Sequence, residues 1–237
     1  MGPRRRTALP ENGKASAMTT QYKDRADAGR LLAPRLNHYR GNPRAIVLGL
    51  ARGGVVVGFY VAQALELPLD VFVVRKLGVP GREEVAMGAI APNGVRVINR
   101  DVIRHLGISE ESIALAAATE QKELERREAL YRGGRFFPDL TDRIVILVDD
   151  GIASGASMLA AVRSIKSMRP ARLVTAVPVA AGEACERFSA EVDEMVCGFT
   201  PPDFQSVGRW YYNFTPTGDH EVQHYLQLAV QRLQPVE

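Results

Sequence analysis

The sequence is poor in the features that mark secreted, membrane-spanning and disulfide-stabilised proteins. Its 237 residues include two cysteines. Cys185 and Cys197 are too few and too isolated to predict a disulfide framework or a zinc site. There is no run of about 18 apolar residues, so we expect no membrane partner. The basic N-terminal stretch has no apolar core behind it, which excludes a secretory signal. These absences fit a reducing cytoplasm best.

Two common nucleotide-binding motifs are also missing. No Gly-Lys-Ser/Thr follows a glycine-rich turn, which excludes a P-loop, and the segment "GIASGAS" lacks the three-glycine arrangement of a dinucleotide fingerprint. The formal charge of +3 is a weak indication of an anionic partner. No basic DNA-reading helix is visible, so we expect no nucleic acid as a partner.

What the sequence does contain is a regular alternation of apolar and helical segments after residue 20. We expect residues 1–20 to be a disordered leader or tag, with Met18 an alternative start, and residues 21–237 to form a single domain. Apolar segments at 45–50, 69–74, 143–150, 172–180 and 194–199 predict strands. Segments at 24–39, 55–66, 107–132, 157–168, 181–192 and 219–233 predict helices. Strands that are apolar throughout predict an α/β fold with a largely parallel central sheet flanked by helices.

Two segments interrupt this alternation. Residues 77–100 contain glycines and prolines and predict a long mobile loop with weak hairpin character. Residues 199–217 are aromatic and proline-rich, and we expect a small C-terminal hood there. Its flat side chains could stack on a heterocycle or simply pack the last helix onto the sheet. The acceptor-pocket candidates in this segment are Phe204, Val207 and Trp210.

One stretch, "RIVILVDDGIASGASM", carries the strongest chemical signal. A buried strand ends on Asp149 and Asp150, and small residues then lead into a helix. Backbone N–H groups of such a turn, together with the helix N-terminus, favour a phosphate group. Carboxylates accept hydrogen bonds from vicinal hydroxyls of a sugar, so a ribose 5-phosphate would span the turn. The alternatives are aspartates that bind Mg²⁺ directly or that cap the helix.

The stretch resembles the phosphoribosyl-pyrophosphate signature of type I phosphoribosyltransferases, in which a strand, two acids, a Thr/Ser-Gly-x-Thr/Ser cradle and a helix follow in that order. The resemblance covers about residues 22–237. It extends to an uncharacterised bacterial subgroup with "LGLARGGVVV", "VRKLGVPGREEVAMGAI" and "VDDGIASGAS" in this order.

The resemblance implies a role for each matching position. Asp149 and Asp150 would hold the ribose hydroxyls and, with Lys76, form the catalytic group. The 5-phosphate would lie on Ala153, Ser154, Gly155, Ala156 and Ser157. The leaving pyrophosphate would contact Arg52, Gly53, Gly54 and Arg75. For Arg52, Arg75 and Lys76 the alternative is an ordinary surface charge.

The resemblance further implies displacement of pyrophosphate from phosphoribosyl pyrophosphate by a nitrogen acceptor. Mg²⁺ would be bound mainly through the substrate, with Asp149 or Asp150 as optional ligands, rather than by a dedicated set of side chains. Residues 77–100 would close as a lid, and Glu83 or Glu84 would organise metal, deprotonate the acceptor, or stay solvated. Purine-type members carry an acid where this chain has Ala153, which argues against a 6-oxopurine acceptor. The resembling families usually form homodimers.

Three functions remain open at this point. The first is an active phosphoribosyltransferase with an unknown acceptor, which the combination of Lys76 and the "ARGG" turn favours. The second is a regulator that only binds phosphoribosyl pyrophosphate or a nucleotide. The third is a metal-dependent phosphohydrolase, for which the sequence lacks additional His or carboxylate clusters.

Overall fold

The computed structural model describes residues 21–233, so the predicted leader or tag lies outside the described residues. The main sheet has five parallel strands in the order β2-β1-β6-β7-β8. Their bounds are Ala45–Leu50 for β1, Leu69–Phe72 for β2, Ile144–Val148 for β6, Arg172–Val179 for β7 and Glu194–Phe199 for β8. The predicted parallel sheet is confirmed.

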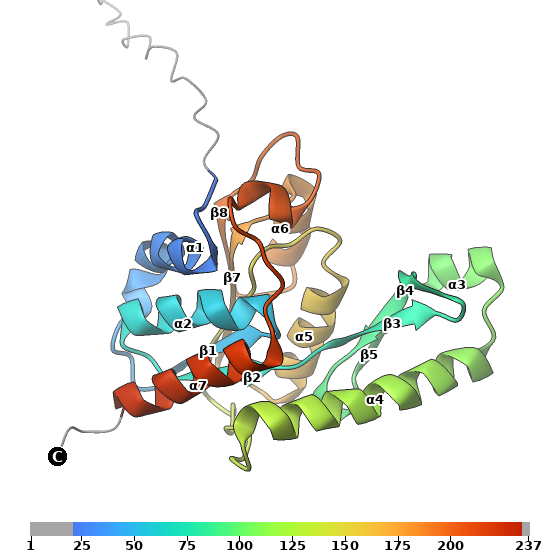
Figure 1. Ribbon diagram of the computed structural model, residues 1–237, viewed down its shortest axis with the longest axis horizontal. Helices are drawn as coiled ribbons and strands as arrows, with labels where there is room; N and C mark the ends of the chain where they lie inside the picture. Colours follow the sequence, from blue (N-terminus) through green and yellow to red (C-terminus); the bar gives the residue numbers. More distant parts are fainter. Residues whose placement is uncertain (1–20, 234–237) are drawn as a thin grey trace, which may run out of the picture.

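Helices cover both faces of this sheet because its strands are apolar on both sides. Successive residues of β1 point to opposite faces: Val47 belongs to one core cluster, and Ile46 and Leu48 to the other. The first cluster packs under α1, α2, α4 and α7, and the second under α5 and α6 (Figure 1). The helix bounds are Arg25–Leu32 for α1, Gly53–Leu65 for α2, Glu110–Arg132 for α4, Asp219–Leu233 for α7, Ala156–Ser167 for α5 and Gly182–Ser189 for α6. None of the helices in the described part of the chain is both long and apolar enough to cross a membrane.

Local capping explains where two helices begin. The Asp24 side chain accepts a hydrogen bond from the backbone N–H of Asp27 at the start of α1, and Ser109 caps α4 through the N–H of Ser112. The predicted first helix ends sooner than its periodicity indicates. Pro34 stands near the start of a 3-10 helix, Ala33–Tyr39, that continues from α1.

The segment at 77–100, predicted as a long loop with weak hairpin character, forms a small antiparallel sheet, so the hairpin is confirmed and the loop is wrong. Strands β3 (Arg75–Val79), β4 (Arg82–Ile90) and β5 (Arg96–Ile98) pair in the order β3-β4-β5, and helix α3 (Arg100–Leu106) follows. We call residues 75–106 the arm. Figure 1 shows it standing off the main sheet with α4 running beside it. Gly88 fits the close pairing of β4 and β5, since an added Cβ would lie 2.4 Å from the Val97 carbonyl oxygen.

The two cysteines form a disulfide, which corrects the expectation that they are isolated. Cys185 lies on α6 and Cys197 on β8, with Cα atoms 6.6 Å apart. Helix α6 packs against the strand that follows it, so residues separated by 12 positions become neighbours.

Candidate functional site

The predicted site residues converge because β1 and β6 are adjacent parallel strands. Gly49 of β1 pairs with Val148 of β6, so the turns that follow both strands leave the same edge of the sheet. A Cβ added to Gly54 would lie 2.6 Å from the Val148 carbonyl oxygen and 2.8 Å from the Asp149 Cα. A glycine is thus required at position 54, the last residue of the "ARGG" turn, for the turns after β1 and β6 to contact each other. The chain also reverses its winding direction here, where α/β sheets bind ligands.

Among the cavities lined by the described residues, two adjoining ones at this edge contain the predicted acid and cations. The first, which we call the loop cavity, has a volume of about 250 Å³ and is lined by Leu50, Ala51, Lys76, Asp149, Val207 and residues 151–158. The second, which we call the cationic cavity, has a volume of about 560 Å³, and its charged lining residues are Arg52, Arg75, Lys76, Glu83, Glu120 and Arg127. Ala51, Lys76 and Ser157 line both cavities, so the two are contiguous.

The turn 153–157 has the geometry of an anion cradle. Gly155 precedes helix α5 with a φ of +73°, a conformation that favours glycine. A Cβ at this position would lie 2.5 Å from Cε2 of Phe188, which α6 places beneath the loop. No side chain of the described residues caps α5, so its first N–H groups are available at the loop cavity.

The two adjacent aspartates have different surroundings. Asp149 lines the loop cavity, and its Oδ1 accepts a hydrogen bond of 2.8 Å from the backbone N–H of Asp150. Burial, and then the neighbouring charge of Asp150, raise the pKa of Asp149 well above its ordinary value. Asp150 instead accepts a hydrogen bond of 2.8 Å at Oδ2 from Nε of Arg25. Burial raises the pKa of Asp150, and the Arg25 charge opposes that rise.

The predicted cations have different surroundings. Lys76 is exposed and lines both cavities. Arg75 lines the cationic cavity, but its Nε donates a hydrogen bond of 2.7 Å to Glu120 of α4. Arg52 lies 3.7 Å from Asp219 at the start of α7, with 39% of its side chain exposed. Lys76 is therefore the predicted cation with the most freedom to meet a ligand.

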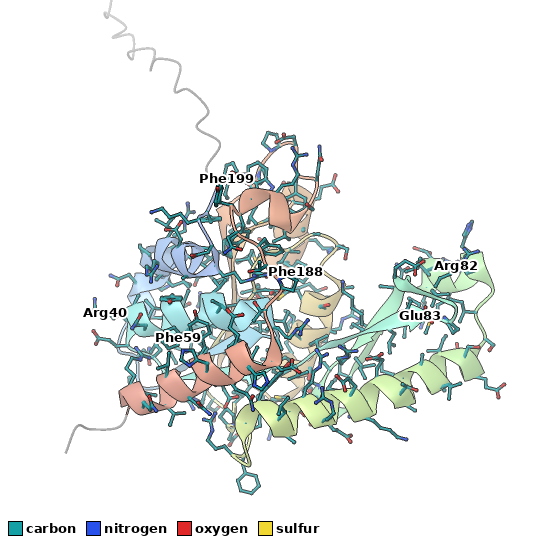
Figure 2. The ribbon with its side chains drawn as sticks, in the orientation of Figure 1. Arg40, Phe59, Arg82, Glu83, Phe188 and Phe199 are labelled. Atoms are coloured by element: carbon teal, nitrogen blue, oxygen red, sulfur yellow. A yellow bond between two sulfur atoms is a disulfide. The ribbon has the colours of Figure 1, made fainter. Side chains whose placement is uncertain are left out.

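The arm supplies one of its two predicted acids to this region. Glu83 lines the cationic cavity together with Gly78 and Pro80 of the same hairpin. Figure 2 shows Glu83 on the arm, away from the main sheet. Glu84 is exposed. The hairpin therefore forms a wall of the cationic cavity.

Of the residues predicted in the hood (199–217) as an acceptor pocket, Val207 lines the loop cavity, whereas Trp210 lies in a core cluster. An added Cβ on Gly151 would lie 2.6 Å from Cγ1 of Val207, so Val207 lines the loop cavity close to the turn that follows the two acids. Trp210 is 7% exposed and packs edge-on against Phe199, with ring centroids 5.1 Å apart. Phe204 is partly buried against the same cluster. The packing interpretation therefore describes Trp210 better than the pocket interpretation.

Three residues of this region were missed from the sequence. Arg25 contacts Asp150, the Tyr211 hydroxyl donates a hydrogen bond of 2.6 Å to the Asp150 carbonyl oxygen, and Arg187 donates one of 2.6 Å to the Ser154 carbonyl oxygen. These three residues are at least 33 positions from their partners. No local spacing or composition signal links residues so far apart.

Comparison with known proteins identifies the family of this chain. The family model described as "Phosphoribosyl transferase domain" matches residues 18–204. Two Mycobacterium tuberculosis proteins, named "Putative phosphoribosyl transferase Rv0571c" (strain H37Rv) and "Putative phosphoribosyl transferase MT0597" (strain CDC 1551), are each 46% identical over 208 residues. The match covers 88% of this chain and 47% of each relative, so the chain spans about half the length of these curated proteins.

A solved structure is similar over almost its whole length. The crystal structure of TT1426 from Thermus thermophilus is 41% identical, with a TM-score of 0.72 over 87% of this chain and 97% of that one. The strand order, the turn after β6 and the matched residues lead to one conclusion. This chain belongs to the phosphoribosyl transferase domain family.

Proposed function

We propose that this chain transfers ribose 5-phosphate from phosphoribosyl pyrophosphate to a nitrogen acceptor, with release of pyrophosphate. The observation that carries the proposal is the contiguity of the loop cavity and the cationic cavity. An anion cradle, an acid and a set of cations meet at one sheet edge, in the order in which the 5-phosphate, the ribose and the diphosphate follow one another in this donor.

Each part of the donor has a matching environment. The 5-phosphate would accept hydrogen bonds from the backbone N–H groups of residues 153–157 at the start of α5. The ribose hydroxyls would donate to the Asp149 carboxylate, which lines the same cavity. The diphosphate would lie in the cationic cavity, near Lys76, Arg52 and the backbone of Gly53 and Gly54. Arg75 would share its charge between the diphosphate and Glu120.

In the reaction, the bond between the anomeric carbon and the pyrophosphate oxygen breaks, and its electron pair leaves with pyrophosphate. The lone pair of the acceptor nitrogen forms the new bond to carbon, and the nitrogen's proton passes to solvent. Charge accumulates on the departing pyrophosphate, so groups aimed at the cationic cavity lower the barrier. Removing one such preorganised donor typically costs about 10²-fold or more in rate.

Magnesium fits this donor set as a substrate-carried ion. The described residues contain no cluster of three or more His, Cys, Asp or Glu side chains that could hold a metal. The Asp149 carboxylate and the phosphate oxygens of the donor are the hard oxygen ligands that Mg²⁺ prefers. When bound, the ion would neutralise charge on the diphosphate.

The arm and the hood complete the proposal. The β3–β4 hairpin already forms a wall of the cationic cavity, so a small inward movement of the arm would cover the site and exclude water. Val207 and Ile152 line the loop cavity beside Asp149, which makes them the favoured acceptor neighbours. Phe204 packs against the same core cluster as Val207.

The test is pyrophosphate release from phosphoribosyl pyrophosphate with Mg²⁺ and a panel of purine, pyrimidine and simple amine acceptors. We expect acceptor-dependent release, and Lys76→Met should reduce the rate about 10²-fold. Lys122→Met, an exposed lysine on α4 outside the cavities, is the matched control. Donor binding without turnover for any acceptor would indicate a regulator instead. Release of inorganic phosphate alone would indicate a hydrolase.

A further inference from the structure

Arg25 is held more completely than an ordinary surface arginine. Its Nε donates to Asp150 Oδ2 at 2.8 Å, and its Nη1 donates to the Thr215 carbonyl oxygen at 2.8 Å. The Phe214 ring centroid lies 4.0 Å from the guanidinium carbon. The ion pair is largely buried, with 11% of the Arg25 side chain and 16% of the Asp150 side chain exposed. A planar guanidinium satisfies all three partners at once, which an ammonium group cannot do.

The Arg25–Asp150 ion pair lies directly against Gly53, in the turn that would hold the diphosphate. A Cβ added to Gly53 would lie 2.0 Å from Asp150 Oδ2 and 2.7 Å from Arg25 Nε. Gly53 is the first residue of α2, so the Asp150 carboxylate occupies the space left by a missing side chain at that helix terminus. The position of Asp150 is therefore set from two sides, by Arg25 and by the backbone of Gly53.

Arg25 also connects Asp150 to the hood. The chain just before α1 pairs with the hood: the Tyr22 N–H donates to the Trp210 carbonyl oxygen and the Tyr212 N–H donates to the Tyr22 carbonyl oxygen, both at 2.8 Å. The Tyr211 hydroxyl then donates to the Asp150 carbonyl oxygen at 2.6 Å. The start of the domain, the hood and the second acid thus form one hydrogen-bonded unit.

From this geometry we infer that Arg25 is a positioning residue for donor binding: it holds the Asp150 carboxylate against Gly53 and leaves Asp149 as the acid that faces the sugar. The inference rests on the proposed function for its substrate. It assigns different tasks to two neighbouring acids that the sequence treats as equivalent. Asp149 contacts the ribose, and Asp150 orients the turn between the ribose and the diphosphate.

The test is a double-mutant cycle on the dissociation constant of phosphoribosyl pyrophosphate with Mg²⁺, measured by isothermal titration calorimetry. Arg25→Gln should raise this constant about tenfold in the wild-type background and change it by less than about twofold in an Asp150→Asn background. Arg25→Lys should behave like Arg25→Gln, because lysine keeps the positive charge but lacks the planar guanidinium that donates to two partners at once. Arg30→Gln, an exposed arginine on the same helix, is the control that should leave binding unchanged.

Several outcomes would overturn the inference. Equal weakening by Arg25→Gln in both backgrounds would show a purely structural role, and full affinity in Arg25→Lys would show that charge alone suffices. A crystal structure of ligand-free Arg25→Lys supplies a readout that needs no substrate: the Asp150 carboxylate should leave Gly53. If wild-type protein fails to bind the donor while this displacement is seen, the proposed function fails and the positioning by Arg25 stands. An unmoved Asp150 carboxylate would refute the positioning itself.

Discussion

The substitution Gly155→Ala should destabilise the turn at 153–157, the proposed anion cradle, by two separable effects. Gly155 has a φ of +73°, and the left-handed conformation costs an L-residue about 1–2 kcal/mol. The new Cβ would also meet Cε2 of Phe188 at 2.5 Å and Nη2 of Arg187 at 2.8 Å. Phe188 is fully buried and has no space to retreat, and overpacking of this kind costs about 1–3 kcal/mol more. We expect a total loss of about 2–5 kcal/mol in the free energy of unfolding.

The chain offers a matched control for this experiment. Gly133, which ends α4, has a φ of +56° and nothing within 4 Å of an added Cβ. Gly133→Ala should therefore cost only the backbone part, about 1–2 kcal/mol. Urea denaturation of both variants isolates the packing part as their difference. Equal losses in the two variants would refute the close packing of Phe188 beneath the cradle.

Three further predictions concern other groups. Burial and the Asp150 charge raise the pKa of Asp149 above its ordinary value of 3.8, so its stabilising contribution is complete below that pH and is lost as pH rises through the raised value. In thermal melts, Asp149→Asn should thus stabilise the protein by about 0.5–2 kcal/mol at neutral pH and leave its stability unchanged near pH 3.8. The same substitution should abolish turnover. A stability difference between variant and wild type that does not change with pH would contradict this. Asp70→Ala removes a partner of Arg132, which is 6% exposed, and should cost about 3 kcal/mol in urea denaturation; a change under about 1 kcal/mol would show the pair to be dispensable. Arg187→Ala releases the Ser154 carbonyl and should weaken binding of phosphoribosyl pyrophosphate about tenfold, with unchanged affinity refuting a role in ordering the loop.

Most of the main sheet was predictable because its signals are local. Each of its strands is a short apolar run, and the capping residues Asp24 and Ser109 stand at the expected helix starts. The arm was not predictable in the same way. Glycines interrupt β3 and β4, β5 has three residues, and all three strands are only partly buried. Their stability therefore depends on pairing with one another and on packing against α4 and α5.

The site divides along the same line. The motif after β6 by itself determined where the two acids and the proposed anion cradle would lie, because a strand, a turn and a helix terminus are contiguous in the chain. Only the tertiary structure decided that Asp149 lines the cavity, that Asp150 is bound by Arg25 and that Trp210 is part of the core. Those distinctions depend on which side chains from distant parts of the sequence pack beside a residue, and the residues next to it in the sequence do not determine that.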